Sequence, residues 1–104
     1  MLGTARRLYS PNFFAWALTS ELSYARLGLI AGRKAAPRAV DRNRGKRLIR
    51  EWFRAVRGDL VGLDVVVQLR TSLRDADNAA LRAELQQLQV RIRKAAQRQP
   101  HGQQ

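Results

Sequence analysis

The sequence predicts a small α+β domain: a two-layer sandwich in which helices pack on one mostly antiparallel sheet. Three short apolar segments, rich in aromatic or β-branched residues, have the length of strands: residues 13–18, 25–31 and 63–69. Two longer segments repeat apolar residues with helical spacing: residues 40–57 and 81–95. At 104 residues the chain supports one modest core, so we expect a single domain over residues 1–96.

The N-terminal part predicts two strands joined by a turn. Residues 3–10 read as a short edge strand, and Ser10-Pro11-Asn12 is typical of a turn. In the strand at residues 13–18, alternation places Phe14, Trp16 and Leu18 on one face and three further apolar residues on the other. Because both faces of this strand are apolar, we expect a helix to pack on one face and a further part of the protein or a partner to cover the other.

The next strand, residues 25–31, is expected to run antiparallel to the previous one after a hairpin loop at residues 19–23. A basic loop follows, in which Pro37 suits the first turn of a helix. We expect Gly58 to end that helix, and we expect Gly45 to weaken it by up to about 1 kcal/mol relative to alanine.

The helix at residues 40–57 is amphipathic. Five apolar side chains fall within roughly 140° of its circumference and should dock on the core: Leu48, Ile49, Trp52, Phe53 and Val56. Arginines and a lysine cover most of the remaining surface. The strand after it, residues 63–69, reads LDVVVQL and is expected to be buried on both faces. A strand–helix–strand order predicts a crossover to a parallel neighbour, right-handed by the general rule.

The second helix carries an apolar stripe at Leu81, Leu85, Leu88, Ile92 and Ala95. Packing against the sheet is favoured over a coiled-coil dimer, because only about two heptads are present. Its N-terminus is expected to be capped by a Ser72 and Asp75 pair or, alternatively, by Asp77. Residues 97–104 have no core residue and are expected to form a disordered tail.

Charge is concentrated in residues 26–57. This stretch holds eleven Lys or Arg residues and two acids, so it carries nine of the chain's twelve net positive charges. Such a density either meets an anionic partner or destabilises the fold by self-repulsion. The chain has no cysteine and one histidine, His101, so it cannot form a Cys/His metal site or a Ser/His/Asp or Cys/His catalytic set. No apolar run is long enough to span a membrane, no signal peptide is evident, and a cytoplasmic location is expected.

The same stretch carries a specific pattern. It reads Arg26-Leu-Gly-Leu, then Arg33-Lys34, then Ala39-Val-Asp-Arg-Asn-Arg-Gly-Lys-Arg-Leu-Ile-Arg-Glu51. This pattern resembles the protein subunit of bacterial ribonuclease P over some thirty residues, with weaker similarity from Gly3 to about Leu88. The chain departs from the family at Gly45, where an aliphatic residue is usual, and at Pro37-Arg38.

The resemblance implies a fold of the ribosomal protein S5 domain 2-like type, with a left-handed βαβ crossover in place of the usual right-handed one. The family normally has a further amphipathic helix before the position of Gly3, flanking a cleft on the sheet. The sequence is expected to lack that helix.

The resemblance also implies a function. Ribonuclease P hydrolyses a phosphodiester bond to remove the 5′ leader of precursor tRNA, and the catalyst is a large RNA. The chain is therefore expected to be a subunit of an endoribonuclease without catalytic residues of its own. Its partners would be the catalytic RNA and precursor tRNA, with no DNA and no membrane, and Mg²⁺ would be held by the RNA and the substrate.

By position, the resemblance places nine residues against RNA: Arg42, Asn43, Arg44, Lys46, Arg47, Arg50, Arg26, Arg33 and Lys34. It places Trp16 and Phe14 in the leader-binding cleft. The residues alone favour a core role for Trp16, and a solvated helix face remains the alternative for Arg47 and Arg50. The alternative function is a general RNA-binding protein, such as a ribosomal protein or an RNA chaperone.

Overall fold

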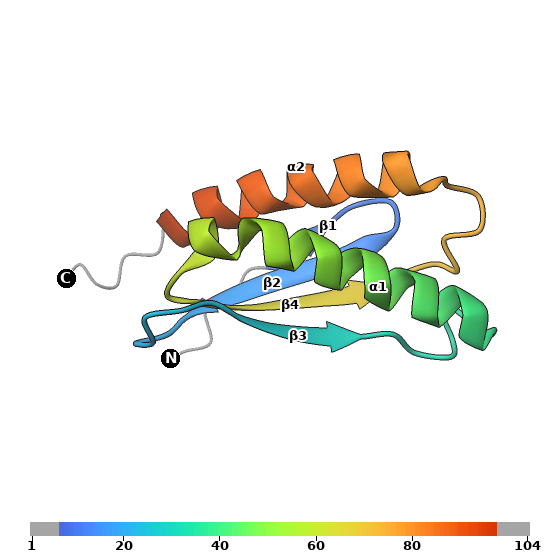
Figure 1. Ribbon diagram of the computed structural model, residues 1–104, viewed down its shortest axis with the longest axis horizontal. Helices are drawn as coiled ribbons and strands as arrows, with labels where there is room; N and C mark the ends of the chain where they lie inside the picture. Colours follow the sequence, from blue (N-terminus) through green and yellow to red (C-terminus); the bar gives the residue numbers. More distant parts are fainter. Residues whose placement is uncertain (1–6, 98–104) are drawn as a thin grey trace.

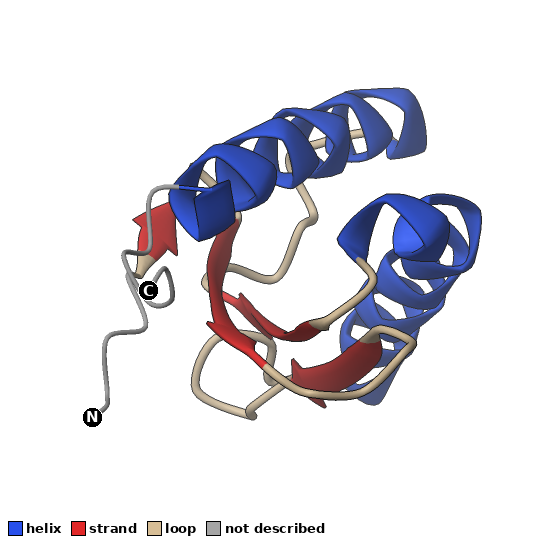
Figure 2. Ribbon diagram, turned by 90° about the vertical axis from the view of Figure 1, so that its left-hand side faces the viewer, coloured by secondary structure: helices blue, strands red, loops and turns tan. Residues whose placement is uncertain are grey.

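The structure, a computed structural model, describes residues 7–97 and has the predicted two layers. Its elements are β1 (Leu8–Tyr9), β2 (Phe13–Thr19), β3 (Arg26–Ile30), α1 (Ala39–Val56), a 3₁₀ turn (Arg57–Leu60), β4 (Leu63–Leu69) and α2 (Asn78–Gln97). The four strands form one sheet in the order β1-β2-β4-β3. Both helices cover the same face of the sheet (Figure 1, Figure 2). The predicted α+β class is therefore confirmed.

Strand β4 occupies a central position that the sequence did not indicate. It pairs antiparallel with β2 and parallel with β3, so it lies between two strands that are consecutive in the chain. The predicted hairpin between β2 and β3 is therefore wrong, although the two strands do run in opposite directions. The apolar face of β4 is buried along the whole strand, as expected for a central strand.

The connection β3–α1–β4 is left-handed. In Figure 1, β3 and β4 both point to the right, β4 lies above β3, and α1 crosses in front of the sheet. A right-handed crossover would place β4 on the other side of β3. The expectation taken from the family resemblance is confirmed, and the one taken from the general rule is wrong.

Only one face of β4 is covered by helices. Leu63, Val65, Val67 and Leu69 are buried, and the residues between them are half-buried on the opposite side. The prediction that β4 is buried on both faces is wrong, because α1 and α2 lie on the same side of the sheet. We call the uncovered side the open face; it consists of Tyr9, Phe14, Trp16, Leu18, Arg26, Gly28, Ile30, Asp64, Val66 and Gln68.

Helix α1 docks through the predicted apolar side. Leu48, Ile49 and Trp52 are buried, and the other two predicted residues are partly buried against the core. The helix begins at Ala39, one residue before the predicted start, and Pro37 lies outside its first turn because Arg38 is the N-cap. It also ends differently: the chain tightens into the 3₁₀ turn that buries Leu60. Among the glycines of residues 7–97, Gly62 adopts a positive φ, and Gly58 does not.

Gly45 has a packing role that helix propensity did not reveal. A Cβ at this position would lie 2.9 Å from both Cδ atoms of Leu69 and 3.1 Å from Cδ1 of Leu73. Both leucines are buried, so α1 approaches the end of β4 closely because residue 45 has no side chain. The missing side chain thus allows a helix–sheet contact as well as costing helix propensity.

Helix α2 packs on the sheet, as the favoured reading predicted. Leu81, Leu85, Leu88 and Ile92 are buried, and α2 contacts β1, β2 and α1. Asp77 caps the helix, because its Oδ1 accepts a 2.8 Å hydrogen bond from the backbone N–H of Ala80. The disordered tail was predicted from residue 97, but Gln97 is the last residue of α2, and residues 98–104 lie outside the described residues. Of the edge strand predicted at residues 3–10, β1 forms Leu8–Tyr9, and residues 3–6 lie outside the described residues.

Candidate nucleic-acid interface

The outer side of α1 presents free cationic side chains. Arg47, Arg50 and Asn43 are exposed, and Lys46 is half-buried. Among the described residues, none of the three cations forms an ion pair with an acid. Arg47 and Arg50 point away from the core because Leu48 and Ile49 take the buried positions beside them. These four predicted residues therefore form one surface, able to meet several phosphates at once.

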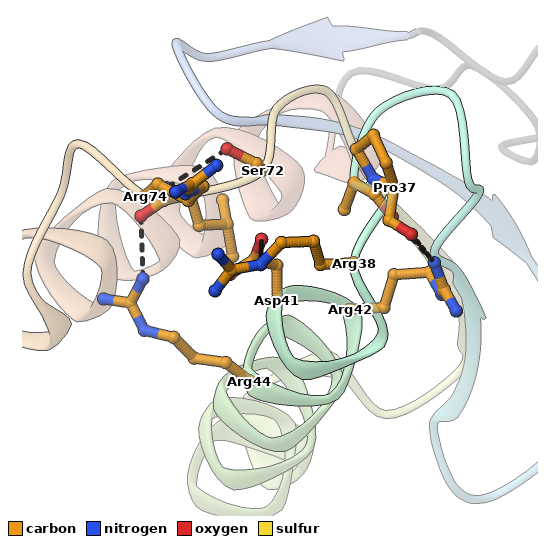
Figure 3. Close-up of polar contacts among 9 residues, drawn as sticks. Pro37, Arg38, Asp41, Arg42, Arg44, Ser72 and Arg74 are labelled. Carbon is orange, nitrogen blue, oxygen red and sulfur yellow. Dashed lines mark hydrogen bonds and ion pairs between the residues drawn. The ribbon is translucent and has the colours of Figure 1, made fainter.

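Arg42 lies on the same helix but is engaged within the protein. Its Nη1 donates hydrogen bonds to the carbonyl oxygens of Ala36, at 2.9 Å, and Pro37, at 2.8 Å (Figure 3). These bonds fix the loop that enters α1. The remaining guanidinium donors of Arg42 are the ones available to a ligand.

Arg44 forms more hydrogen bonds within the protein than Arg42 does. Its Nε donates to Oδ1 of Asn78 at 3.0 Å, its Nη1 to the carbonyl of Leu73 at 2.7 Å, and its Nη2 to the carbonyl of Ala76 at 2.6 Å. Figure 3 shows the Arg44 side chain extending from α1 toward the loop before α2. All three guanidinium nitrogens thus hold the protein's own loop, so the structure places Arg44 apart from the free cationic surface of α1.

Arg26 lies on a different side of the molecule from α1. On the open face, its Nε and Nη2 donate to the two carboxylate oxygens of Asp64, at 2.8 and 2.7 Å. This hydrogen-bonded pairing holds the pKa of Asp64 below its usual range, and the same contact raises the pKa of Arg26. Arg33 and Lys34 are exposed in the loop that follows β3.

Trp16 and Phe14 lie on the open face and not in the core. Both rings are half-buried, whereas Phe13 and Ala15 on the other side of β2 are fully buried. The core role that the residues alone favoured for Trp16 is therefore wrong. Tyr9 meets the Phe14 ring edge-on, with 5.0 Å between the ring centroids, and arginine side chains lie against the rings of Phe14 and Trp16.

Two of the arginines on the open face were missed by sequence reasoning. The guanidinium carbon of Arg7 lies 5.0 Å from the Phe14 ring centroid and 5.1 Å from that of Trp16. The guanidinium carbon of Arg70 lies 4.8 Å from the Phe14 ring centroid. These are cation–π distances. The signal for Arg7 was alternation along the first strand, since position 7 falls on the same side as Tyr9. The signal for Arg70 was the same alternation, since position 70 follows Asp64, Val66 and Gln68 on the half-buried side of β4.

The two predicted binding regions occupy opposite sides of the sheet. The free cations of α1 belong to the helical layer, and the aromatic residues of β2 belong to the open face. The region on α1 offers guanidinium and ammonium groups for phosphates, and the open face offers aromatic rings for unstacked bases together with guanidinium groups. The fold and these surfaces define a small α+β RNA-binding protein.

Comparison with known proteins identifies its family. Residues 1–93 match the family model described as Ribonuclease P. The ribonuclease P protein component of Thioalkalivibrio sulfidiphilus is 42% identical over 92 residues, covering 88% of this chain and 77% of that protein. The protein component from Pseudomonas fluorescens is 43% identical over 70 residues, and the match spans 53% of its length, about half. The chain belongs to the ribonuclease P protein family.

Solved structures agree with this assignment. The ribonuclease P protein from Thermotoga maritima superimposes with a TM-score of 0.74 at 32% identity, covering 86% of this chain and 84% of that one. The Staphylococcus aureus ribonuclease P protein gives a TM-score of 0.76 at 25% identity, covering 88% and 83%. The two structural matches extend over most of the chain.

Proposed function

We propose that this chain is the protein subunit of a ribonuclease P holoenzyme. The observation that carries the proposal is the family match over residues 1–93, which includes both binding regions. In this proposal Arg47, Arg50 and Lys46 bind phosphates of the catalytic RNA, and Trp16 and Phe14 contact the 5′ leader of precursor tRNA. The protein then assists endonucleolytic removal of the leader by adding binding energy and by offsetting phosphate repulsion.

The proposal assigns the chemistry to the RNA. Among residues 7–97, no group of three or more His, Cys, Asp or Glu side chains lies close enough to hold a metal ion. Four of the acids pair with arginines: Asp64 with Arg26, Asp41 with Arg38, Glu51 with Arg82, and Asp59 with Arg93. Asp41 and Glu51 thus balance neighbouring arginines, as predicted. The described residues do not fit a Mg²⁺ site, and we propose that Mg²⁺ is held by the RNA and the substrate.

The proposal also places the protein in the cytoplasm, where precursor tRNA is made. Within residues 7–97, neither helix combines the length and the apolar character that a bilayer crossing requires. A general RNA-binding role remains the alternative function, but nothing in the two surfaces favours it over the family's role.

A reconstitution experiment tests the proposal. Purified protein, its cognate RNA and Mg²⁺ are combined with precursor tRNA labelled at the 5′ end, and leader release is measured. At low Mg²⁺ we expect cleavage by RNA with protein to exceed cleavage by RNA alone, and protein alone to release nothing. Equal cleavage with and without protein would contradict the subunit role. Leader release by the protein alone would contradict the assignment of chemistry to the RNA.

A further inference from the structure

A pocket of about 440 Å³ opens where β2 begins and where β3 and β4 end. We call it the end pocket; it is lined by Phe14, Gly32, Lys34, Ala35, Gln68, Leu69 and Arg70. Its volume lies within the range of about 300–1,000 Å³ that is typical of small-molecule sites. It joins the basic loop after β3 to the aromatic residues of the open face, which are separated in the sequence.

The end pocket is suited to an anion. Lys34 and Arg70 both line it, and no acidic side chain does. Among the described residues, neither cation is paired with a carboxylate. A phosphate group placed between an ammonium and a guanidinium would form charge-assisted hydrogen bonds with both.

Arg70 is held in position before any ligand binds. Its Nη1 donates to the carbonyl of Ser10 at 2.6 Å, and its backbone N–H donates to the carbonyl of Asn12 at 2.9 Å. Glu84 of α2 fixes that turn, because its carboxylate accepts hydrogen bonds from the backbone and side-chain nitrogens of Asn12 at 2.7 and 2.8 Å. The guanidinium of Arg70 therefore stays over the ring of Phe14, and its remaining N–H groups are available to a ligand.

Gln68 supplies a group that can distinguish one base from another. It is the direct cross-strand partner of Phe14, so its side chain lies beside that ring on the open face. Gln68 is half-buried, and its amide forms no hydrogen bond with any described residue. A free carboxamide offers both a donor and an acceptor, which suits the edge of an unpaired base.

From these contacts we infer that the end pocket binds one nucleotide of the single-stranded leader and that Gln68 selects its base. The phosphate lies between Lys34 and Arg70, and the base edge lies against the Gln68 carboxamide. This inference rests on the proposed function. An unpaired nucleotide of the catalytic RNA has the same chemistry, so the experiment must separate the two sources.

The test uses the reconstituted holoenzyme and precursor tRNAs whose leader is varied one position at a time. For the wild-type protein we expect a base preference at one leader position. Gln68→Leu keeps a side chain of similar length but removes the amide, so that preference should disappear while preferences at other positions stay. Affinity for mature tRNA and assembly with the catalytic RNA should not change. Gln87→Leu, at an exposed position of α2, is the matched control and should behave as wild type.

A second arm locates the phosphate. Precursor tRNAs carry a neutral methylphosphonate at one leader linkage at a time, and affinity for the holoenzyme is measured. One linkage, adjacent to the base that Gln68 selects, should lose about ten-fold or more in affinity with wild-type protein. With Lys34→Ala the same substitution should cost much less, and Lys94→Ala, an exposed lysine on α2, should retain the full loss.

Three outcomes would overturn the inference. Gln68→Leu could keep the wild-type base preference at every leader position, or the sensitive linkage could lie far from the selected base. A loss of affinity for mature tRNA or for the catalytic RNA would assign the pocket to a different nucleotide source. In each case the wild-type protein still stimulates leader release, so failure of the pocket is distinguishable from failure of the proposed function.

Discussion

Arg44 donates a 2.7 Å hydrogen bond from Nη1 to the carbonyl oxygen of Leu73, whose backbone adopts a positive φ of 66°. This φ is unfavourable for a residue with a branched side chain. Leu73 is nevertheless buried, and its side chain lies against the space left by Gly45. Two adjacent residues of α1 therefore hold the loop before α2. Arg44 donates hydrogen bonds to carbonyl oxygens of the loop, and Gly45 allows the loop to pack closely.

Arg44→Ala should lower the stability of the protein. The substitution removes three hydrogen bonds from a charged donor and leaves the carbonyls of Leu73 and Ala76 without this partner. A loss of about 1.5–3 kcal/mol is expected from the value of such bonds. Urea unfolding followed by circular dichroism measures it, and Arg47→Ala on the exposed side of α1 is the control. Equal midpoints for the two variants would show that the Arg44 contacts contribute nothing.

Arg47→Ala should instead change RNA binding. If Arg47 neutralises one phosphate, removing it should reduce the slope of log affinity against log salt by about 0.7–0.9. Filter binding of the catalytic RNA between low and moderate salt measures the slope. Arg93→Ala, at an arginine paired with Asp59 on the other helix, is the control and should keep the wild-type slope. An unchanged slope in Arg47→Ala would mean that Arg47 only faces solvent.

Gly45→Ala should destabilise the protein despite alanine's better helix propensity. The new Cβ gains about 1 kcal/mol of propensity, but overpacking a filled core typically costs about 1–3 kcal/mol. Gly58→Ala is the matched control, because a Cβ there meets nothing within 4 Å. Thermal unfolding should place Gly45→Ala below wild type and Gly58→Ala at or above it. A stabilised Gly45→Ala would show that Leu69 and Leu73 move aside at little cost.

The pairing of Arg26 with Asp64 predicts that the stability of the fold depends on pH in the acidic range. The folded protein holds the pKa of Asp64 below that of the unfolded chain, so the pair contributes stability above the unfolded value, about 3.9. That contribution falls as pH drops through the lower folded pKa, because Asp64 becomes protonated. Asp64→Asn should remove it, so the variant should lose less stability than wild type on acidification below about pH 4. Parallel acid dependence of the two proteins would contradict the pairing.

Trp16→Ala should weaken precursor tRNA binding by roughly ten-fold or more, because stacking of a base on an indole contributes about 1–3 kcal/mol. Mature tRNA has no leader, so its affinity for the holoenzyme should hardly change. Because Trp16 lies on the open face, the variant should stay folded, whereas Trp52→Ala in the core should lose about 3–5 kcal/mol of stability. An unchanged ratio of precursor to mature tRNA affinity in folded Trp16→Ala would remove Trp16 from the leader site.

The sequence by itself determined the elements and the basic surface. Residues that recur every three or four positions, such as Leu48 and Trp52 or Leu81 and Leu85, must share one side of a helix, and burying them requires a core. The same periodicity turns Arg47 and Arg50 outward. The resemblance added the left-handed crossover, which local patterns do not encode, because handedness depends on how strands far apart in the chain are ordered.

Tertiary structure alone decided which side chains remain free. Arg44 and Arg47 are both arginines on the same helix. Arg44 donates hydrogen bonds to carbonyls of a loop about thirty residues away, whereas Arg47 is exposed. The insertion of β4 between β2 and β3 likewise placed Gln68 beside Phe14 and left Trp16 on an open face. These outcomes depend on contacts between distant segments, which close only when the whole chain has folded, so no local pattern of residue types could specify them.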